Sequence, residues 1–264
     1  MGGQKLGVAL GAGGARGLAH IGVLQALKEM DVKIDCIAGS SIGSMIAAFY
    51  GNKMDLRMVG KFLASLNRKH WLDLCVPGLG LVTGDKFKEI VKLLTHNKNI
   101  EDLSIPIAIV ATDLEKGERV VFLKGPIYQA VRASCSIPGI FVPEKVNGNI
   151  LVDGGVIDRV PTSVVKDLGA DYTIAVDVAP KKSEVKISTM FDVIAQTIDI
   201  LEAEILKLRL LDADVVIQPK VGHIGIASFD KVEECIESGY IAAYEKEQQI
   251  ISLLKNKRGD SNEL

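Results

Sequence analysis

The chain has 264 residues, of which 48% are hydrophobic and 24% are charged, and its formal net charge is −2 at pH 7. This length suits one large domain with a substantial core, and the balanced charge argues against general nucleic-acid binding, which needs a basic face. No run approaches the roughly 18 apolar residues of a membrane-spanning helix, and the first ten residues lack the apolar core of a signal peptide, so we expect a cytoplasmic protein, at most peripheral on a membrane.

The chain opens with a predicted βαβ unit. Residues 5–14, KLGVALGAGG, predict a buried strand that runs into a glycine-rich turn, and residues 17–30 have the apolar spacing of a helix packed on a sheet. A second strand, DCIAGS, is predicted over 35–40. Such a unit implies a parallel sheet with right-handed crossovers.

Strands and helices alternate through the rest of the chain. Nearly continuous apolar runs, typical of a sheet covered on both faces, predict strands over 105–114, 118–123, 172–178 and 214–219. Helices are predicted over 43–51, 84–95, 161–167, 188–210 and 230–254. With no low-complexity linker, the sequence indicates one α/β domain over 1–254 and a polar, disordered tail over 255–264.

Three segments need a closer reading. Residues 70–85, which include the single tryptophan, predict an apolar loop that serves as an acyl-chain lid, as a membrane contact or as a buried connection. Residues 134–161 carry three of the eight prolines and are predicted to form a long irregular connection, which is often functional. The helix over 188–210 spaces six apolar residues at helical intervals, which predicts a core-facing side; these are Phe191, Ile194, Ile198, Leu201, Ile205 and Leu208.

A glycine-rich loop, GAGGARG, occupies residues 11–17. It departs from the dinucleotide-binding fingerprint because Arg16 stands where the third glycine is needed. A nucleotide-binding module therefore stays only as a weaker alternative. The amides of such a loop suit any anion, including one that exists only in a transition state.

The GxSxG motif around Ser41, with Gly39 and Gly43, lies between a predicted strand and a predicted helix. Small flanking residues allow a sharp turn that exposes a nucleophilic serine. The alternative is a serine that only caps the helix. The glycine-rich loop about 25 residues upstream favours catalysis.

The general base is not evident among the four histidines. Only His223 lies well downstream of Ser41, as the α/β-hydrolase order requires, but that fold builds several strands before its nucleophile. Asp153 ends a short apolar run and precedes Gly154 and Gly155, which allow a tight turn under its carboxylate. Desolvation of such an aspartate would raise its pKa and make it a better base.

Four motifs in this order and spacing resemble the patatin-like phospholipases, particularly the small bacterial members. They are GAGGARGLAHIGVLQAL, GSSIGS, ASCSIPGIFVP and DGGVIDRVP, and the resemblance extends over about residues 5–220. It implies a three-layer α/β/α fold with a mostly parallel central sheet. It also implies a Ser-Asp dyad in place of a triad, which explains the missing histidine.

Carried onto this sequence, the resemblance implies Ser41 as nucleophile and Asp153 as proton acceptor. The loop residues match the family's oxyanion-hole segment, with Arg16 expected to brace the loop or to meet a lipid phosphate; these residues are Gly13, Gly14, Ala15 and Arg16. One departure lies near the base, because Asp158 stands where family members often carry asparagine.

The implied activity is hydrolysis of lipid carboxylic esters, as by a phospholipase A, a lysophospholipase or an esterase, through an acyl-enzyme. No cofactor is expected, and no His/Asp/Glu cluster shows the spacing of metal ligands. The expected partner is a lipid or another acyl ester. A catalytically silent lipid-binding or regulatory protein is the main alternative.

Overall fold

The computed structural model describes residues 4–65, 73–76, 78–179, 187–188, 190–207 and 212–259. Within these residues, eight strands form one sheet in the order β5-β6-β3-β2-β1-β7-β8, with β4 also paired to β3. The strands are β1 Leu6–Leu10, β2 Cys36–Ser40, β3 Ile107–Asp113, β4 Glu118–Phe122, β5 Glu144–Val146, β6 Asn149–Asp153, β7 Tyr172–Val176 and β8 Val215–Ile217.

The centre of the sheet is parallel. The pairs β1–β2, β1–β7, β2–β3 and β7–β8 are parallel, whereas β3–β4, β3–β6 and β5–β6 are antiparallel. β1 lies between β2 and β7, and these three strands run in the same direction. The residues that follow β1 and β2 therefore emerge at the same edge of the sheet. The predicted mostly parallel α/β fold is confirmed.

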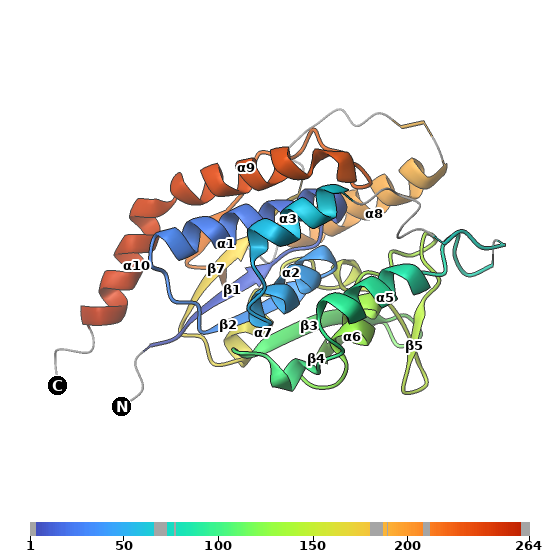
Figure 1. The fold of residues 1–264 in the computed structure, drawn as a ribbon, viewed down its shortest axis with the longest axis horizontal. Coiled ribbons are helices and arrows are strands. Elements are labelled where there is room, and N and C mark those ends of the chain that lie inside the picture. The colour runs from blue at the N-terminus through green and yellow to red at the C-terminus, as the bar shows by residue number, and fades with distance from the viewer. Residues whose placement is uncertain are drawn as a thin grey trace.

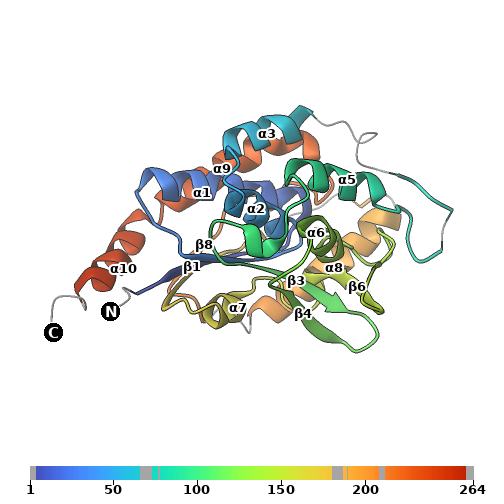
Figure 2. The same ribbon diagram turned by 60° about the horizontal axis from the view of Figure 1, so that its bottom comes forward.

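Helices cover both faces of the sheet (Figures 1 and 2). Alternate strand residues divide between two clusters, so that Leu6, Val8 and Leu10 of β1 join the larger cluster and Ala9 joins the smaller one. The larger cluster packs against α1 Ala19–Glu29, α2 Ile42–Gly51 and α9 Val232–Tyr244. The smaller cluster packs against α7 Thr162–Asp167 and Leu206 of α8 Met190–Lys207. The three layers follow from this alternation, since successive strand side chains point to opposite faces.

Four further helices complete the described part of the fold, namely α3 Leu56–Ser65, α5 Asp85–Leu94, α6 Ile127–Ser134 and α10 Glu247–Gly259. Of these, α3 lies beside α1 and α9, and α6 packs on β3. The sequence predicted neither α3 nor α6. It predicted one helix over 230–254, which the structure divides into α9 and α10, and α10 extends to Gly259, past the predicted start of the tail; residues 260–264 lie outside the described residues.

Two other predictions were wrong. The segment 134–161 is not irregular throughout, because it contains β5 and β6, which form an antiparallel extension of the sheet next to β3. The predicted core-facing side of α8 is not fully buried either, since Ile194 and Ile198 are half-buried and the side chains of Leu201 and Ile205 are 60% and 38% exposed. Phe191 and Leu208 of that side lie outside the described side chains.

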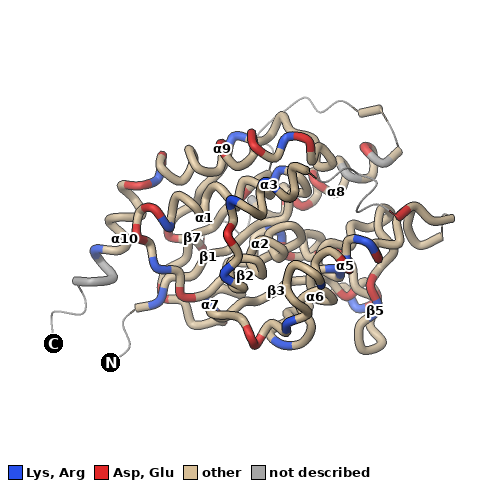
Figure 3. The backbone as a smooth tube through the Cα atoms, in the orientation of Figure 1, with Lys and Arg blue, Asp and Glu red and all other residues tan. Residues whose placement is uncertain are grey.

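In the backbone view of Figure 3, basic and acidic residues lie close together around α5 and β5, whereas the charged residues of α9 itself are all glutamates. This mixture agrees with the net charge of −2.

Among the described residues, none of the helices has the length and hydropathy needed to cross a membrane.

Candidate active site

Ser41 occupies a strained turn between β2 and α2. Its backbone has φ 54° and ψ −127°, a left-handed conformation that non-glycine residues rarely adopt. The flanking glycines are required by close packing, because a Cβ on Gly43 would overlap the backbone oxygen of Leu10 and a Cβ on Gly39 would lie 2.5 Å from the backbone of Gly43. The residues of the GxSxG motif therefore allow β2, the serine and α2 to meet at this sharp angle.

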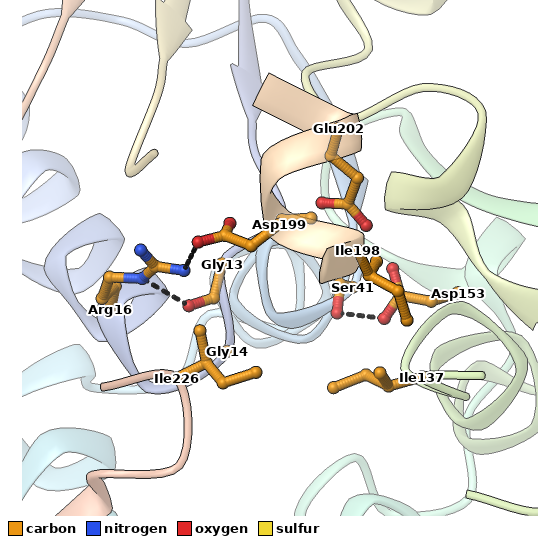
Figure 4. A pocket seen from close by; sticks show the side chains of 11 residues that line it. Gly13, Gly14, Arg16, Ser41, Ile137, Asp153, Ile198, Asp199, Glu202 and Ile226 are labelled. Atoms are coloured by element: carbon orange, nitrogen blue, oxygen red, sulfur yellow. Dashed lines mark hydrogen bonds and ion pairs between the residues drawn. The ribbon is translucent and has the colours of Figure 1, made fainter. Parts of the chain in front are cut away.

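Two hydrogen bonds hold Ser41 in the turn. Its backbone N–H donates to Ser134 Oγ at 2.8 Å, and that hydroxyl donates in turn to Val110 O of β3 at 2.6 Å. The Ser41 side chain donates from Oγ to Asp153 Oδ2 at 2.5 Å. Figure 4 shows the serine and the aspartate pointing toward each other.

Asp153 comes from the end of β6, where its backbone pairs with Ala111 of β3. The chain then turns into a 3₁₀ segment, Gly154–Val156, and the N–H of Gly155 donates to Asp153 Oδ1 at 2.8 Å. A Cβ on Gly154 would overlap Val110 O, so glycine is needed for this turn as well. Both oxygens of the carboxylate thus accept a hydrogen bond from a defined direction.

Burial raises the pKa of Asp153 to about 6. The hydrogen bonds from Ser41 and Gly155 and the charge of Arg159 act in the opposite direction, because each stabilises the carboxylate. Asp153 is 3% exposed and Ser41 is 4% exposed. The aspartate is therefore a stronger base than a solvated carboxylate and still ionises below neutral pH.

The glycine loop follows β1 and lines the same pocket. Gly14 has φ 57°, and a Cβ there would overlap Ile226 O. The amide of Ala15 donates to Ile226 O at 2.8 Å, so this predicted member of the oxyanion segment has no free N–H to offer. Among the described residues, no acceptor bonds the amides of Gly13 and Gly14, which line the pocket together with Ser41.

Arg16 does not point to solvent. Its guanidinium is buried, with Nε donating to Gly13 O at 3.3 Å and Nη2 to Asp199 Oδ2 at 2.7 Å. Of the two predicted roles, this geometry is that of a brace for the loop.

The sequence reasoning missed three charged residues of the pocket region. Arg159, six residues after the predicted base, pairs with Asp199 Oδ1 at 2.8 Å and with Glu202 Oε2 at 2.8 Å. Asp199 and Glu202 are three residues apart on α8, so that they lie on one face of the helix. Their spacing was visible in the sequence, but only the buried Arg16 and Arg159 give these carboxylates a partner.

Three of the four histidines lie within the described residues, and His96 is exposed in the turn after α5. His20 Nε2 lies 2.8 Å from Gly11 O inside the core, and burial lowers its pKa to about 4, which keeps the ring neutral. His223 is exposed and pairs with Glu234 of α9 at 2.6 Å. Neither His20 nor His223 contacts Ser41, and His70 lies outside the described residues.

Asp158, the departure from the family pattern near the predicted base, is 2.7 Å from Arg119 Nη1 and thus forms an ion pair.

An apolar cavity of about 410 Å³ begins at Ser41. Its size falls in the range of roughly 300–1,000 Å³ that is usual for small-molecule sites. Its wall includes side chains of α2, of α5 and of the loops before α5 and after α6, among them Met45, Phe49, Leu81, Phe87, Ile90 and Phe141.

The described part of the predicted 70–85 loop is buried at one end and exposed at the other. Leu81 and Val82 line the cavity, and Val82 is buried. Leu74 also lines the cavity but is 81% exposed, and Val76 is 91% exposed. Trp71 lies outside the described residues. Within the part of the chain that the structure describes, no three His, Cys, Asp or Glu side chains are grouped to hold a metal ion.

Two solved structures resemble this fold. VipD from Legionella pneumophila gives a TM-score of 0.67 at 14% sequence identity, covering 93% of this chain and 67% of VipD. The type III effector protein ExoU gives a TM-score of 0.52, also at 14% identity, covering 94% of this chain and 53% of ExoU. At this identity the likeness concerns the fold alone.

The sequence has closer relatives. An uncharacterized NTE family protein of Mycobacterium tuberculosis is 40% identical over 174 residues, which make up 65% of this chain and 48% of that protein. Human patatin-like phospholipase domain-containing protein 6 is 36% identical over 199 residues, 72% of this chain and 14% of that protein. The chain thus spans about half of the mycobacterial relative and a much smaller part of the human one. A family model described as patatin-like phospholipase matches residues 8–166. With this match, the chain belongs to the patatin-like phospholipase family.

Proposed function

We propose that the protein is a serine acyl hydrolase that cleaves carboxylic esters of lipids, as a phospholipase A, a lysophospholipase or a related esterase does. The observation that carries this proposal is the 2.5 Å hydrogen bond from Ser41 Oγ to Asp153 Oδ2 beside an apolar cavity. A hydroxyl becomes a useful nucleophile when a positioned base accepts its proton.

The first half-reaction forms an acyl-enzyme. Ser41 Oγ attacks the ester carbonyl carbon while Asp153 Oδ2 takes the hydroxyl proton, and the carbonyl oxygen becomes an oxyanion. Collapse of this intermediate breaks the bond to the alcohol, which leaves with the proton returned by Asp153. Water then attacks the acyl-enzyme by the same path, releases the fatty acid and restores the serine.

Gly13 and Gly14 are the proposed oxyanion donors. Their amides line the pocket next to Ser41 without an acceptor among the described residues. Arg16 keeps this loop in place through its bond to Gly13 O and its ion pair with Asp199. Removing one such donor typically costs about 10²–10³ in rate, so the loop would carry a large share of catalysis.

The raised pKa of Asp153 supports its role as the base. With a value of about 6, the carboxylate is ionised at neutral pH but holds a proton more readily than a solvated aspartate. A dyad can therefore operate here without a histidine.

The apolar cavity is the proposed site of the acyl chain. It starts at Ser41, so an ester carbonyl at the serine would direct its hydrocarbon tail along Met45, Phe49 and Phe87. Burial of apolar surface contributes roughly 25 cal/mol per Å², which favours long acyl chains over short ones.

We extend the proposal to peripheral contact with a lipid surface. Leu74 lines the cavity and is also strongly exposed, and Val76 and Leu79 next to it are 91% and 66% exposed. This apolar edge is thus continuous with the cavity, and a bilayer would cover it while supplying the substrate. We expect phosphatidylcholine vesicles to sediment the wild-type protein and to sediment a Leu74→Ser/Val76→Ser double variant less. Equal sedimentation of both proteins would remove this extension.

The experiment that tests the activity combines labelling with turnover. A fluorophosphonate probe and intact-protein mass spectrometry would be applied to wild type, Ser41→Ala and Asp153→Asn, each checked for folding by circular dichroism. We expect one adduct on wild type, none on Ser41→Ala and a strongly slowed reaction for Asp153→Asn. Lipid and nitrophenyl esters of increasing chain length would then report turnover.

Three results would contradict the proposal. No adduct on folded wild type together with binding of fatty-acyl ligands would favour a silent lipid-binding protein. Stabilisation by a dinucleotide without labelling would favour a nucleotide-binding module. Near-full esterase activity of Asp153→Asn would remove Asp153 from the mechanism.

A further inference from the structure

Of the three buried acids that line the pocket beside Ser41, the proposed mechanism gives a part to Asp153 and to Asp199 and leaves Glu202 unused. Glu202 of α8 is 7% exposed and lines the pocket that also contains Ser41 and Asp153. Its carboxyl group points from α8 toward the side of the pocket where Asp153 lies (Figure 4). A glutamate is almost never buried without a specific partner, so its presence beside a catalytic dyad requires a reason.

The charged groups around Glu202 do not balance one another. Two guanidiniums, from Arg16 and Arg159, face three carboxyl groups, from Asp153, Asp199 and Glu202. Asp199 binds both guanidiniums, which outweigh the effect of burial and lower its pKa. The surplus negative charge therefore concerns Asp153 and Glu202, and the charge of Asp153 raises the pKa of Glu202.

The hydrogen bonds distinguish these two carboxyls. Asp153 accepts a donor on each oxygen, from Ser41 Oγ and from the Gly155 N–H. Glu202 accepts from Arg159 Nη1 on Oε2, while its Oε1 lies against Gly155, 2.7 Å from where a Cβ would stand. The carboxyl with donors on both oxygens is the better place for a charge, and an oxygen packed on a backbone carbon is the better place for a proton.

We propose that Glu202 is a positioning residue for Asp153: as a neutral carboxyl it packs against Gly155, anchors Arg159 and leaves the negative charge of the pocket on the base. This inference rests on the proposed serine hydrolase function. It gives α8 a part in the reaction, although α8 lies beyond residues 8–166 that match the family model.

The titration of the group agrees with this geometry. Burial raises the pKa of Glu202 to about 8; the charge of Arg159 acts against this rise, and the charges of Asp153 and Asp199 add to it. The remaining charged neighbour is Asp177, whose oxygens accept from the Ala179 N–H and from Gln218 Nε2 and whose charge stabilises Arg159. Glu202 is thus neutral at pH 7 and becomes charged above pH 8.

Ionisation of Glu202 has a predictable effect on the reaction. A second negative charge in the pocket disfavours the oxyanion that forms near Gly13 and Gly14. Activity should therefore rise as Asp153 loses its proton near pH 6 and fall as Glu202 loses its proton above pH 8. A glutamine at position 202 has the size of the neutral acid and cannot ionise.

The test compares wild type, Glu202→Gln and Glu204→Gln in kcat/KM for a soluble ester between pH 5 and pH 10. Glu204 is exposed on the same helix. Its replacement by glutamine removes one negative charge, as Glu202→Gln does at alkaline pH. We expect wild type and Glu204→Gln to lose about fivefold or more between pH 8 and pH 9.5. Glu202→Gln should keep the acid limb of the profile, and its alkaline loss should disappear. A variant that only loses structure would instead lower the whole profile and keep its shape, which would overturn the proposal.

A second measurement does not depend on turnover. Infrared difference spectra of wild type minus Glu202→Gln should contain the carbonyl band of a protonated carboxylic acid at pH 7, and this band should convert to carboxylate bands near pH 8. A carboxylate signal already at pH 7 would overturn the inference whether or not the protein hydrolyses esters. Failure of the proposed function alone would appear as absent turnover with the protonated band still present.

Discussion

Two helices border the serine, and they bury opposite kinds of side chain. All residues of α2 except Tyr50 are buried, and the helix begins directly after Ser41. In α8, the charged Asp199 and Glu202 are 5% and 7% exposed, whereas the apolar Leu201 is 60% exposed. Hydrophobic packing therefore fixes α2, and ion pairs fix the part of α8 next to the pocket. The comparison teaches that one face of this site depends on shape and the other on charge.

The largest effect is expected where α2 is tied to the sheet. Gly43→Ala places a Cβ on the backbone oxygen of Leu10, so either β1 or α2 must move. We expect a loss of more than about 4 kcal/mol in the free energy of unfolding, measured by urea denaturation. As a control, Gly60→Ala in α3 meets only the flexible Cδ1 of Ile236 and should change stability by about 1 kcal/mol or less. Equal effects of the two variants would contradict the dependence of α2 on close packing.

The corresponding test of α8 removes a charge. Asp199→Asn leaves Arg16 and Arg159 buried with a neutral partner, and loss of one partner of a buried ion pair costs about 3–5 kcal/mol. Thermal and urea unfolding would measure this loss, with Glu204→Gln as the exposed control on the same helix. If Asp199→Asn were as stable as Glu204→Gln, charge would not be what holds α8.

A third pair of variants separates the two sides of α8. Leu206 is 4% exposed and packs in the smaller core cluster, so Leu206→Ala should cost about 2–5 kcal/mol. Leu201→Ala, on the exposed side, should stay within about 0.5 kcal/mol of wild type. Urea unfolding measures both variants. A large loss of stability for Leu201→Ala would mean that the exposed side of α8 is covered in solution.

The smallest effect concerns protonation of the base. Asp153 must be ionised to accept the serine proton, and its pKa of about 6 predicts that labelling of Ser41 slows roughly tenfold from pH 7 to pH 5. Labelling rates between pH 4.5 and pH 7.5 would measure the midpoint. The Asp153→Asn variant, although slow, should show no such limb. A midpoint near pH 4 would indicate a solvated carboxylate.

Much of the fold could be predicted from the sequence where local pattern and tertiary packing agree. The strands over 35–40 and 105–114 have continuous apolar runs because helices cover both of their faces. The short strands β5 and β6 escaped prediction because each has at most five residues, turn residues separate them, and β5 lies at the edge of the sheet. The residues Ser41 and Asp153 were predicted from their glycines, which the tight turns require.

The charged part of the site could not be predicted in the same way. In α8 the apolar positions follow a helical period, which predicts burial, but the neighbouring carboxylates of Asp199 and Glu202 are more buried than the apolar Leu201 and Ile205. Their burial depends on Arg16 and Arg159, which are 183 and 40 residues distant in sequence from Asp199. No local sequence pattern contains these long-range pairings. The glycine loop gives a second example, because the sequence does not indicate that the Ala15 amide donates to Ile226 O. The single domain over 1–254 and the roles of the site residues stay predictions.

The separation of Arg16 from Asp199 has a consequence for synthesis on the ribosome. The nucleophile, the base and both arginines are translated before α8, so for part of translation the two guanidiniums have no carboxylate from α8 to neutralise them. The glycine loop lacks its brace during that time, and the pocket beside Ser41 is incomplete. A nascent chain that already contains the proposed dyad of Ser41 and Asp153 is therefore expected to lack the proposed esterase activity until α8 has left the exit tunnel.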